Sequence, residues 1–308
     1  GAVIHMKSIN MKYLAGGPIE RVKPLPPYDE KICTFLAELS KKLQKDRRAM
    51  AYPDVLSFAF FCRKANIAKL KAEFEDGNTR LGRGLAFHIA PSNVPVNAAF
   101  TYVFGLLAGN ANVVRVSSKD FEQVKIICDV MQTMFDGGNY DEIRDMTAFV
   151  SYGRSQEIND KLSLMANSRI IWGGDTTIAE IRKSPIGFRC TELTFADRYS
   201  FGILNPMKIA DDSEEEIKRL AEQFYNDTYL MDQNACSTPH LILWKSDKSS
   251  KAEEGKKRFW NAVYKEAGKY DLADIKVSDK YVMTCEYAID LECLQELKKY
   301  ENLLYVMT

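Results

Sequence analysis

Cys236 lies in the polar stretch DQNACSTPH (residues 232–240), where its sulfur could act as a nucleophile. A deprotonated thiol attacks carbonyl carbon and forms a covalent thioester, so an accessible cysteine on a turn indicates acyl-transfer chemistry. Asn234 and Ser237 are polar neighbours, and Pro239 ends any helix. By contrast, Cys128 lies in the apolar segment VKIICDV and is expected to be buried. The alternative is that Cys236 is a structural cysteine, one of seven in the chain.

Asn93 stands between two prolines in HIAPSNVP, directly after an apolar segment. The prolines restrain the backbone and therefore limit where the amide can point, and a fixed N–H group can stabilise an oxyanion. The simpler interpretation is that Asn93 caps a helix starting near Pro95. His88 lies within the apolar segment and is expected to be a hydrogen-bonded core histidine. His240 lies in the predicted strand HLILW, so helical i, i+4 pairing with Cys236 is not expected.

Short apolar segments alternate with amphipathic ones along residues 80–185. The predicted strands are LAFHIAP, ANVVRVS, DMTAFVSYG and RIIWGG, and helical patterns lie between and after them. This alternation predicts an α/β fold with a doubly wound parallel sheet. The loops after such strands meet at the carboxyl edge of the sheet, where ligands bind. Residues 54–75 are predicted to be helical, and the proline-rich residues 18–28 to form an extended arm.

The composition narrows the classes of partner. Among 308 residues, Lys plus Arg and Asp plus Glu both number 42, so no net charge attracts nucleic acid or an anionic membrane. The cysteines are scattered and only three histidines are present, which makes a zinc site or a disulfide scaffold unexpected. We find neither a signal peptide nor an apolar run of roughly 20 residues, the length that spans a bilayer. These features predict a cytoplasmic protein with a small-molecule partner.

Several segments together resemble a known family, in order and over about residues 80–245. PSNVP, GNANVVRVSSKD, IIWGGDTTIAEI, CTEL and DQNACS are similar to successive motifs of aldehyde dehydrogenases. Together with FADRYSF (residues 195–201), they most resemble the LuxC-like acyl-CoA reductases of that superfamily. The resemblance implies an aldehyde-dehydrogenase-like fold with a Rossmann-type, doubly wound parallel sheet and a second α/β catalytic domain. It also implies a fatty acyl thioester substrate and NADPH as the cofactor.

The implied reaction reduces the acyl thioester to an aldehyde through an acyl group carried on Cys236. The backbone N–H of Cys236 and the amide of Asn93 would then hold the oxyanion of the tetrahedral intermediates. Glu192 matches the position at which aldehyde-oxidising relatives have a general base. In a reductase we expect Glu192 to serve proton transfer or simply to line the site, because activated water would hydrolyse the acyl group.

The resemblance also implies a cofactor site. Arg115 replaces a family lysine, and with Ser117 and Lys119 it would hold the 2′-phosphate, which favours NADPH over NADH. Gly173 and Gly174 would let the backbone approach the pyrophosphate, while the helix N-terminus at Thr176 supplies N–H groups. Asp175 would repel phosphate, so it is expected to be the N-cap of that helix. No metal site is expected.

The predicted organisation is an N-terminal arm and NADPH-binding domain over residues 1–199 and a thiol-bearing catalytic domain over 200–308. The family's chain returns after the thiol domain, so the sequence ending at Thr308 is expected to lack that final segment. Alternatives remain open: an aldehyde dehydrogenase using NAD(P)+, a cysteine acyltransferase or hydrolase using Cys236 and His240, or a non-catalytic partner protein. The expected macromolecular partners are further copies of the chain, in a homo-oligomer, or acyl-transfer proteins.

Overall fold

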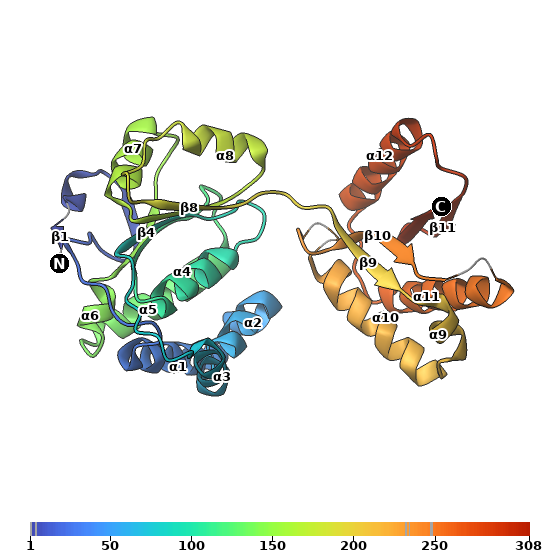
Figure 1. Cartoon of the computed structure of the whole chain (residues 1–308), viewed down its shortest axis with the longest axis horizontal. Coiled ribbons are helices and arrows are strands. Elements are labelled where there is room, and N and C mark those ends of the chain that lie inside the picture. Colours follow the sequence, from blue (N-terminus) through green and yellow to red (C-terminus); the bar gives the residue numbers. More distant parts are fainter. Residues whose placement is uncertain (1, 4, 232, 234, 247–248) are drawn as a thin grey trace. The chain divides into compact units, whose positions relative to one another are not determined.

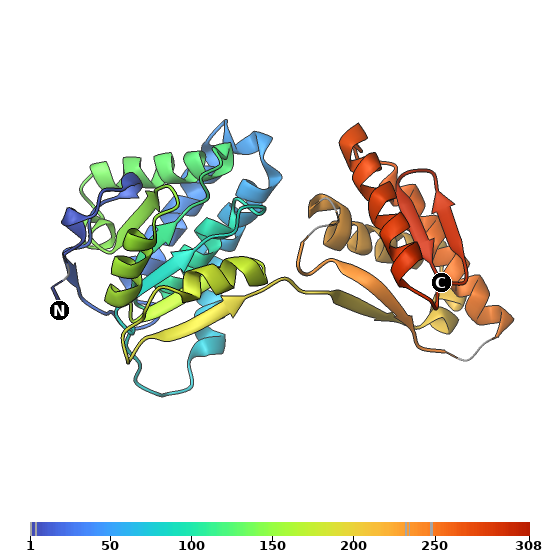
Figure 2. The ribbon, with the colours of Figure 1, turned by 90° about the horizontal axis from the view of Figure 1, so that it is seen from above.

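The chain divides into two compact units, residues 1–197 and 198–308, which are described separately (Figures 1 and 2). The structure is a computed structural model and describes residues 2–3, 5–231, 233, 235–246 and 249–308. No helix within these ranges combines the length and the apolar character needed to cross a bilayer.

Unit 1 is built on a six-stranded sheet with the order β2-β6-β5-β4-β7-β8. The strands from β4 onward are parallel, which confirms the predicted sheet. β2 pairs antiparallel with β6 and was not predicted, because its five residues, KYLAG, form no apolar run. The strands are β2 (Lys12–Gly16), β4 (Leu85–Ile89), β5 (Ala111–Arg115), β6 (Thr147–Ser151), β7 (Ser168–Trp172) and β8 (Thr191–Phe195), with a separate pair of β1 (Ala2–Val3) and β3 (Arg21–Val22).

Helices cover both faces of this sheet. Figure 1 shows α7 (Gln156–Met165) and α8 (Asp175–Arg182) on one face and α4 (Asn97–Leu107) and α5 (Glu122–Asp136) on the other. This is the arrangement that right-handed crossovers produce when the strand order reverses between β4 and β7. The remaining helical segments of the unit are α1 (Glu30–Lys45), α2 (Pro53–Phe61), α3 (Lys64–Phe74), α6 (Asp141–Arg144), η1 (Met6–Ser8) and η2 (Ala49–Ala51).

The helix predicted over residues 54–75 is two helices. The backbone leaves the helical conformation at Arg63, with φ −58° and ψ 142°, so α2 ends at Phe61 and α3 begins at Lys64. Cys62, at this break, is buried among the aliphatic and aromatic side chains of the unit. The prediction was wrong at this point because the apolar periodicity continues through the break while the backbone direction changes.

Unit 2 contains a parallel pair of strands, β9 (Ser200–Leu204) and β10 (Pro239–Trp244), and an antiparallel hairpin, β11 (Leu297–Tyr300) and β12 (Leu304–Met307). Its helices are α9 (Pro206–Asp211), α10 (Glu214–Thr228), η3 (Tyr229–Met231), α11 (Ser250–Ala267) and α12 (Asp274–Asp290). One face of the β9–β10 pair packs through Leu204 and Trp244 onto a core that includes Ile209 and Phe259. α11 begins at Ser250, within the charged segment that follows Trp244.

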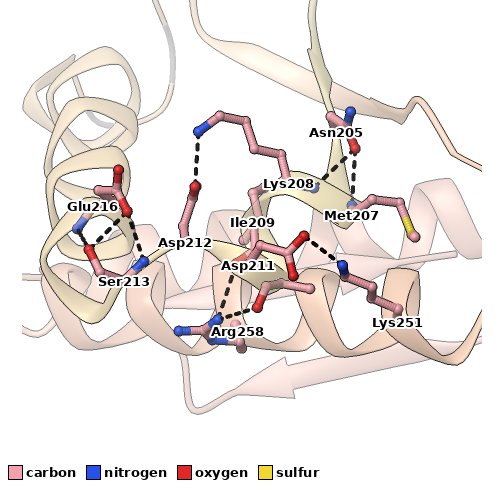
Figure 3. A network of polar contacts seen from close by, with 11 residues as sticks. Asn205, Met207, Lys208, Ile209, Asp211, Asp212, Ser213, Glu216, Lys251 and Arg258 are labelled. Carbon is pink, nitrogen blue, oxygen red and sulfur yellow. Dashed lines mark hydrogen bonds and ion pairs between the residues drawn. The ribbon is translucent and has the colours of Figure 1, made fainter.

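Polar contacts join the short helix α9 to α11 (Figure 3). Arg258 donates hydrogen bonds to the carbonyl oxygens of Ile209 and Ala210, and Lys251 pairs with Asp211 at 2.5 Å. Gly255 lets α11 approach closely, since a Cβ there would lie 1.9 Å from the carbonyl oxygen of Pro206. These contacts satisfy the last carbonyl groups of α9, which intrahelical bonds leave unpaired.

Candidate functional site

The loop after β4 carries Asn93 at the carboxyl edge of the unit 1 sheet. Asn93 is exposed, and α4 begins only at Asn97 with Val96 as its N-cap. No side chain in the described part of the chain caps α4. The interpretation of Asn93 as a helix cap is therefore wrong, because the helix starts four residues beyond it, out of reach of its amide. The side chain is left available for another partner.

The loop after β5 borders a cavity of about 510 Å³ on the α4 and α5 side of the edge. Ser117 and Lys119, both predicted to bind the cofactor, line this cavity, and the backbone N–H of Lys119 donates to the Ser117 hydroxyl at 3.2 Å. The other charged or hydroxyl-bearing lining residues are Lys12, Tyr13, Ser118, Asp120, Lys125, Asp129 and Ser151. Lysines and hydroxyl groups at this position suit an anionic group, although two carboxylates partly offset their charge.

Arg115 lies on the other side of the same edge. Its guanidinium stacks over the ring of Tyr152, 4.6 Å from the ring centroid, and the Tyr152 hydroxyl donates to Asn159 of α7 at 2.9 Å. Arg115 does not line the cavity that Ser117 and Lys119 border. The structure thus divides the three residues predicted to hold one phosphate between the two faces of the sheet.

The loop after β7 brings Gly173 and Gly174 to the start of α8. Gly174 is the N-cap and Asp175 the first helical residue, so the assignment of Asp175 as N-cap is wrong by one position. The described residues provide no side-chain cap for α8, and this leaves the N–H groups of its first turn, including Thr176, without a side-chain acceptor at the cap. A Cβ at Gly174 would lie 2.7 Å from a carboxylate oxygen of Asp197. Two carboxylates, of Asp175 and Asp197, therefore lie near this loop.

Glu192 is held by two arginines at the amino half of β8. Both Arg169 of β7 and Arg182 of α8 donate to its carboxylate, at 2.8 and 2.7 Å. Burial alone raises the pKa of Glu192, but the hydrogen bonds from Arg182 and Arg169 outweigh it and the pKa is lowered. Arg169 is only 2% exposed and also donates to the carbonyl oxygen of Ser184. The arrangement keeps Glu192 ionised and binds it within the fold of unit 1.

A buried polar cluster joins β4, α4 and β5. His88 contacts Thr101 through Nδ1 at 2.8 Å and Asn112 through Nε2 at 2.9 Å, which confirms the prediction of a hydrogen-bonded core histidine. The indole N–H of Trp172 donates to the Thr101 hydroxyl at 3.1 Å. Burial lowers the pKa of His88 to about 4, against a smaller opposing effect of the Asn112 contact, so the ring is neutral near pH 7.

Trp172 and Phe195 are two residues for which no role was expected from the sequence. Trp172 is the last residue of β7 and stacks on Phe195, the last residue of β8, with ring centroids 3.9 Å apart and an interplanar angle of 9°. Both residues can be read from the sequence. Trp172 directly precedes the Gly-Gly loop, and Phe195 lies at the corresponding position of the next strand. Their pairing depends on the β7–β8 register, which only the structure supplies.

In unit 2, hydrogen bonds hold the backbone on either side of Cys236, which is itself exposed. The Ser200 hydroxyl of β9 donates to the carbonyl oxygen of Cys236 at 2.7 Å. On the far side, Thr238 is buried, and its backbone N–H donates to the carbonyl oxygen of Ala235 at 2.9 Å. Asp232 and Asn234, part of the predicted turn, lie outside the described residues. The backbone around the sulfur is thus fixed while the sulfur faces solvent.

The structure confirms two other predictions about reactive groups. Cys128 is buried in α5, as expected, and burial raises the pKa of its thiol. His240 lies on β10, as predicted, and its ring packs against Tyr199 with centroids 5.5 Å apart. Within the described ranges no group of three or more metal-binding side chains occurs.

Comparison with known proteins identifies the fold and the family. Solved structures similar to the chain include aldehyde dehydrogenases. A lactaldehyde dehydrogenase has 12% identity and a TM-score of 0.60, covering 91% of this chain and 63% of its own. The betaine aldehyde dehydrogenase of Staphylococcus aureus in complex with NAD+ has 17% identity and a TM-score of 0.57. The match covers 89% of this chain and 59% of that enzyme. The NADP-dependent glyceraldehyde-3-phosphate dehydrogenase of Bacillus halodurans complexed with NADP has 16% identity and a TM-score of 0.54. The match covers 90% of this chain and 62% of that enzyme.

These likenesses establish an aldehyde-dehydrogenase-like fold, and the chain spans about 60% of the length of these enzymes. No curated protein matches the chain. The model of the family described as acyl-CoA reductase (LuxC) matches residues 10–294, which include segments of both units. The chain therefore belongs to the LuxC acyl-CoA reductase family.

Proposed function

We propose that the protein is an NADPH-dependent acyl-CoA reductase that converts a fatty acyl thioester into an aldehyde through an acyl group carried on Cys236. The observation that carries the proposal is the exposed thiol of Cys236, held on an anchored segment inside the family match. An accessible cysteine whose backbone is fixed by hydrogen bonds can present its sulfur to an acyl carbonyl without reorganising the chain.

Cys236 takes part in both halves of the reaction. Its thiolate sulfur bonds to the acyl carbon, the bond from that carbon to the coenzyme A sulfur breaks, and the released thiolate takes a proton. In the second half, the bond from the acyl carbon to Cys236 breaks as the aldehyde forms. In both halves, negative charge develops on the carbonyl oxygen, and we assign its stabilisation to the backbone N–H of Cys236 and the amide of Asn93. The exposed Asn93 side chain, unused in helix capping, supports this assignment.

We propose that a nicotinamide dinucleotide binds at the carboxyl edge of unit 1. When bound, NADPH supplies the hydride that reduces the acyl group. We assign the 2′-phosphate to Arg115, whose guanidinium is held in place by Tyr152. Ser117 and Lys119 line the cavity on the opposite face of the sheet and are not assigned to that phosphate. The pyrophosphate is assigned to Gly173, Gly174 and the first turn of α8 at Thr176. The carboxylates of Asp175 and Asp197 lie near this loop.

The environment of Glu192 favours reduction over aldehyde oxidation. An oxidising enzyme needs a general base that can accept a proton from water. The carboxylate of Glu192 is bound by Arg169 and Arg182 and has a lowered pKa, so it is a poor proton acceptor. We therefore propose that Glu192 is a structural residue of unit 1 and not the general base.

Mass spectrometry tests the acyl-enzyme directly. After incubation with a long-chain acyl-CoA and no NADPH, we expect an acyl mass on the peptide that contains Cys236, and none after Cys236→Ala. Cys293 is also exposed, so Cys293→Ala is the matched control and should still be acylated at Cys236. Adding NADPH should discharge the acyl group as aldehyde. A protein that remains unmodified at Cys236 with every chain length would overturn the proposal.

A further inference from the structure

The stacked pair of Trp172 and Phe195 is an exposed aromatic surface at the carboxyl ends of β7 and β8. Trp172 covers one face of Phe195, and Phe195 still remains 43% exposed. Stacked aromatic pairs normally contribute most when they are buried in a core or an interface. An aromatic ring that is ordered by its neighbour and left open to solvent is suited to stacking with a planar ligand.

A chain of buried hydrogen bonds fixes the position of Trp172. The amide nitrogen of Asn112 donates to the carbonyl oxygen of Asn110 at 2.8 Å, so the Asn112 oxygen faces His88. That oxygen only accepts, so His88 carries its proton on Nε2 and accepts at Nδ1. The Thr101 hydroxyl must therefore donate to His88, and it accepts from Trp172.

This chain joins four elements of unit 1, because His88 lies on β4, Thr101 on α4, Asn112 on β5 and Trp172 on β7. Thr101, His88 and Asn112 are all buried. The close packing requires Gly105 on α4, where a Cβ would lie 1.9 Å from the Asn112 oxygen. Buried polar groups that are fully paired specify one arrangement, so the indole has one preferred orientation.

The order of the strands places this aromatic pair at one end of the proposed cofactor site. Arg115 ends β5, the glycines follow β7, and Phe195 ends β8. The sheet order β5-β4-β7-β8 separates Arg115 from the Gly173 loop by two strand spacings, roughly 10 Å, and puts Phe195 one strand further. A dinucleotide whose 2′-phosphate lies at β5 and whose pyrophosphate lies at β7 would have its nicotinamide ring beside β8.

We propose that the nicotinamide ring stacks on Phe195, that Trp172 holds Phe195 in place, and that Thr101 is a positioning residue acting through Trp172. The proposal rests on the proposed function, since it requires the cofactor to bind along this edge. Phe195 is then the contact residue. Leu193, two positions earlier on the same face of β8, is an exposed apolar residue whose register partner on β7 is Ile170, which is not aromatic.

Calorimetry with two ligands tests the contact. Phe195→Ala should weaken NADP+ binding about tenfold, the order expected for loss of one stacking contact. The same variant should bind 2′-phospho-ADP-ribose, which lacks the nicotinamide, within about twofold of the unmodified chain. Leu193→Ala, the matched control, should bind both ligands normally. Equal weakening of both ligands by Phe195→Ala, or no weakening of either, would overturn the proposal.

Thr101 is tested through fluorescence. Trp172 is one of three tryptophans, so the Trp244→Phe/Trp260→Phe protein reports on Trp172 alone. NADPH should quench this emission strongly. In that background, Thr101→Val should weaken NADP+ binding about fivefold more than it weakens 2′-phospho-ADP-ribose binding, and Thr101→Ser, which keeps the hydroxyl, should recover most of the loss.

The outcomes separate this inference from the proposed function. If calorimetry detects no binding of NADP+, NADPH or 2′-phospho-ADP-ribose to the unmodified chain, the proposed function fails and the inference with it. If the ligands bind but Trp172 emission does not change and Phe195→Ala behaves like Leu193→Ala, the stacking inference is wrong and the cofactor assignment stands.

Discussion

The strand pair β7–β8 has two contrasting ends. At the amino end, Arg169 and Arg182 both form ion pairs with Glu192. At the carboxyl end, Trp172 and Phe195 present an open aromatic surface next to Gly173 and Gly174. Under the proposed function, the charged residues at the amino end build the fold and the exposed aromatic residues at the carboxyl end are the candidates for binding.

The largest effect should follow from breaking the ion pair at the amino end. Glu192→Gln leaves the guanidinium of Arg169 buried without its counter-charge, and we expect a loss of about 3 kcal/mol in the free energy of unfolding of unit 1. Urea unfolding followed through Trp172 in the Trp244→Phe/Trp260→Phe background measures it. Glu180→Gln removes an exposed pair with Lys183 and should change stability by less than about 0.5 kcal/mol. Equal small changes in both variants would show that Glu192 is not a structural residue.

Acid should also weaken the amino-end pair, with a defined sign. The folded-state pKa of Glu192 is lowered from its ordinary value of 4.5, so its contribution is present above that pH and is lost as the pH falls below it. The contribution of the ion pair to stability is therefore constant between pH 7 and pH 5. This distinguishes it from the contribution of the buried His88, which changes over that interval.

A smaller effect is expected from His88, which is buried and neutral. Its folded-state pKa of about 4 lies below the ordinary 6.5, so the unfolded chain takes up a proton as the pH falls through 6.5 while the folded one does not. Between pH 7 and pH 5 this should lower the stability of unit 1 by about 2 kcal/mol. Unfolding in urea at the two pH values measures the change. His88→Gln should remove most of the difference, and an unaltered pH dependence would contradict a buried neutral histidine.

The smallest effect should come from adding a methyl group at Gly174, in the loop after the carboxyl end of β7. Gly174→Ala places a Cβ against Asp197 and the approach to α8, and we expect about fivefold weaker NADPH binding, equal to about 1 kcal/mol. Gly187→Ala is the control at the amino end, because its Cβ would have no heavy atom closer than 3.8 Å. Calorimetry on both variants should separate them, and identical affinities would remove Gly174 from the proposed cofactor site.

Much of unit 1 could be predicted because its strands are continuous apolar segments. β4, β5, β6 and β7 are buried on both faces, and such strands are recognisable without knowledge of their neighbours. β2 could not be predicted in this way, because it joins the sheet at an edge and only one of its five residues is buried.

The partners of individual side chains were less predictable. Glu192 lies 23 residues from Arg169, and only the β7–β8 register brings them together. The N-cap of α8 differed by one residue because glycine can adopt the cap conformation without contributing a side chain. His88 was predictable, since a histidine inside an apolar strand needs internal hydrogen-bond partners. The predicted roles of Cys236 and Asn93 depend on residues of two separate units and stay predictions.

Hydrogen exchange with and without NADPH compares the two ends of β7–β8 in one experiment. The central claim, that the carboxyl end of unit 1 holds the cofactor, predicts slower exchange at the backbone N–H groups of residues 173–178 when NADPH is added. Residues 183–192, between α8 and the ion pair, should exchange at the same rate with and without it. Protection of residues 183–192 with no change at 173–178 would contradict the claim.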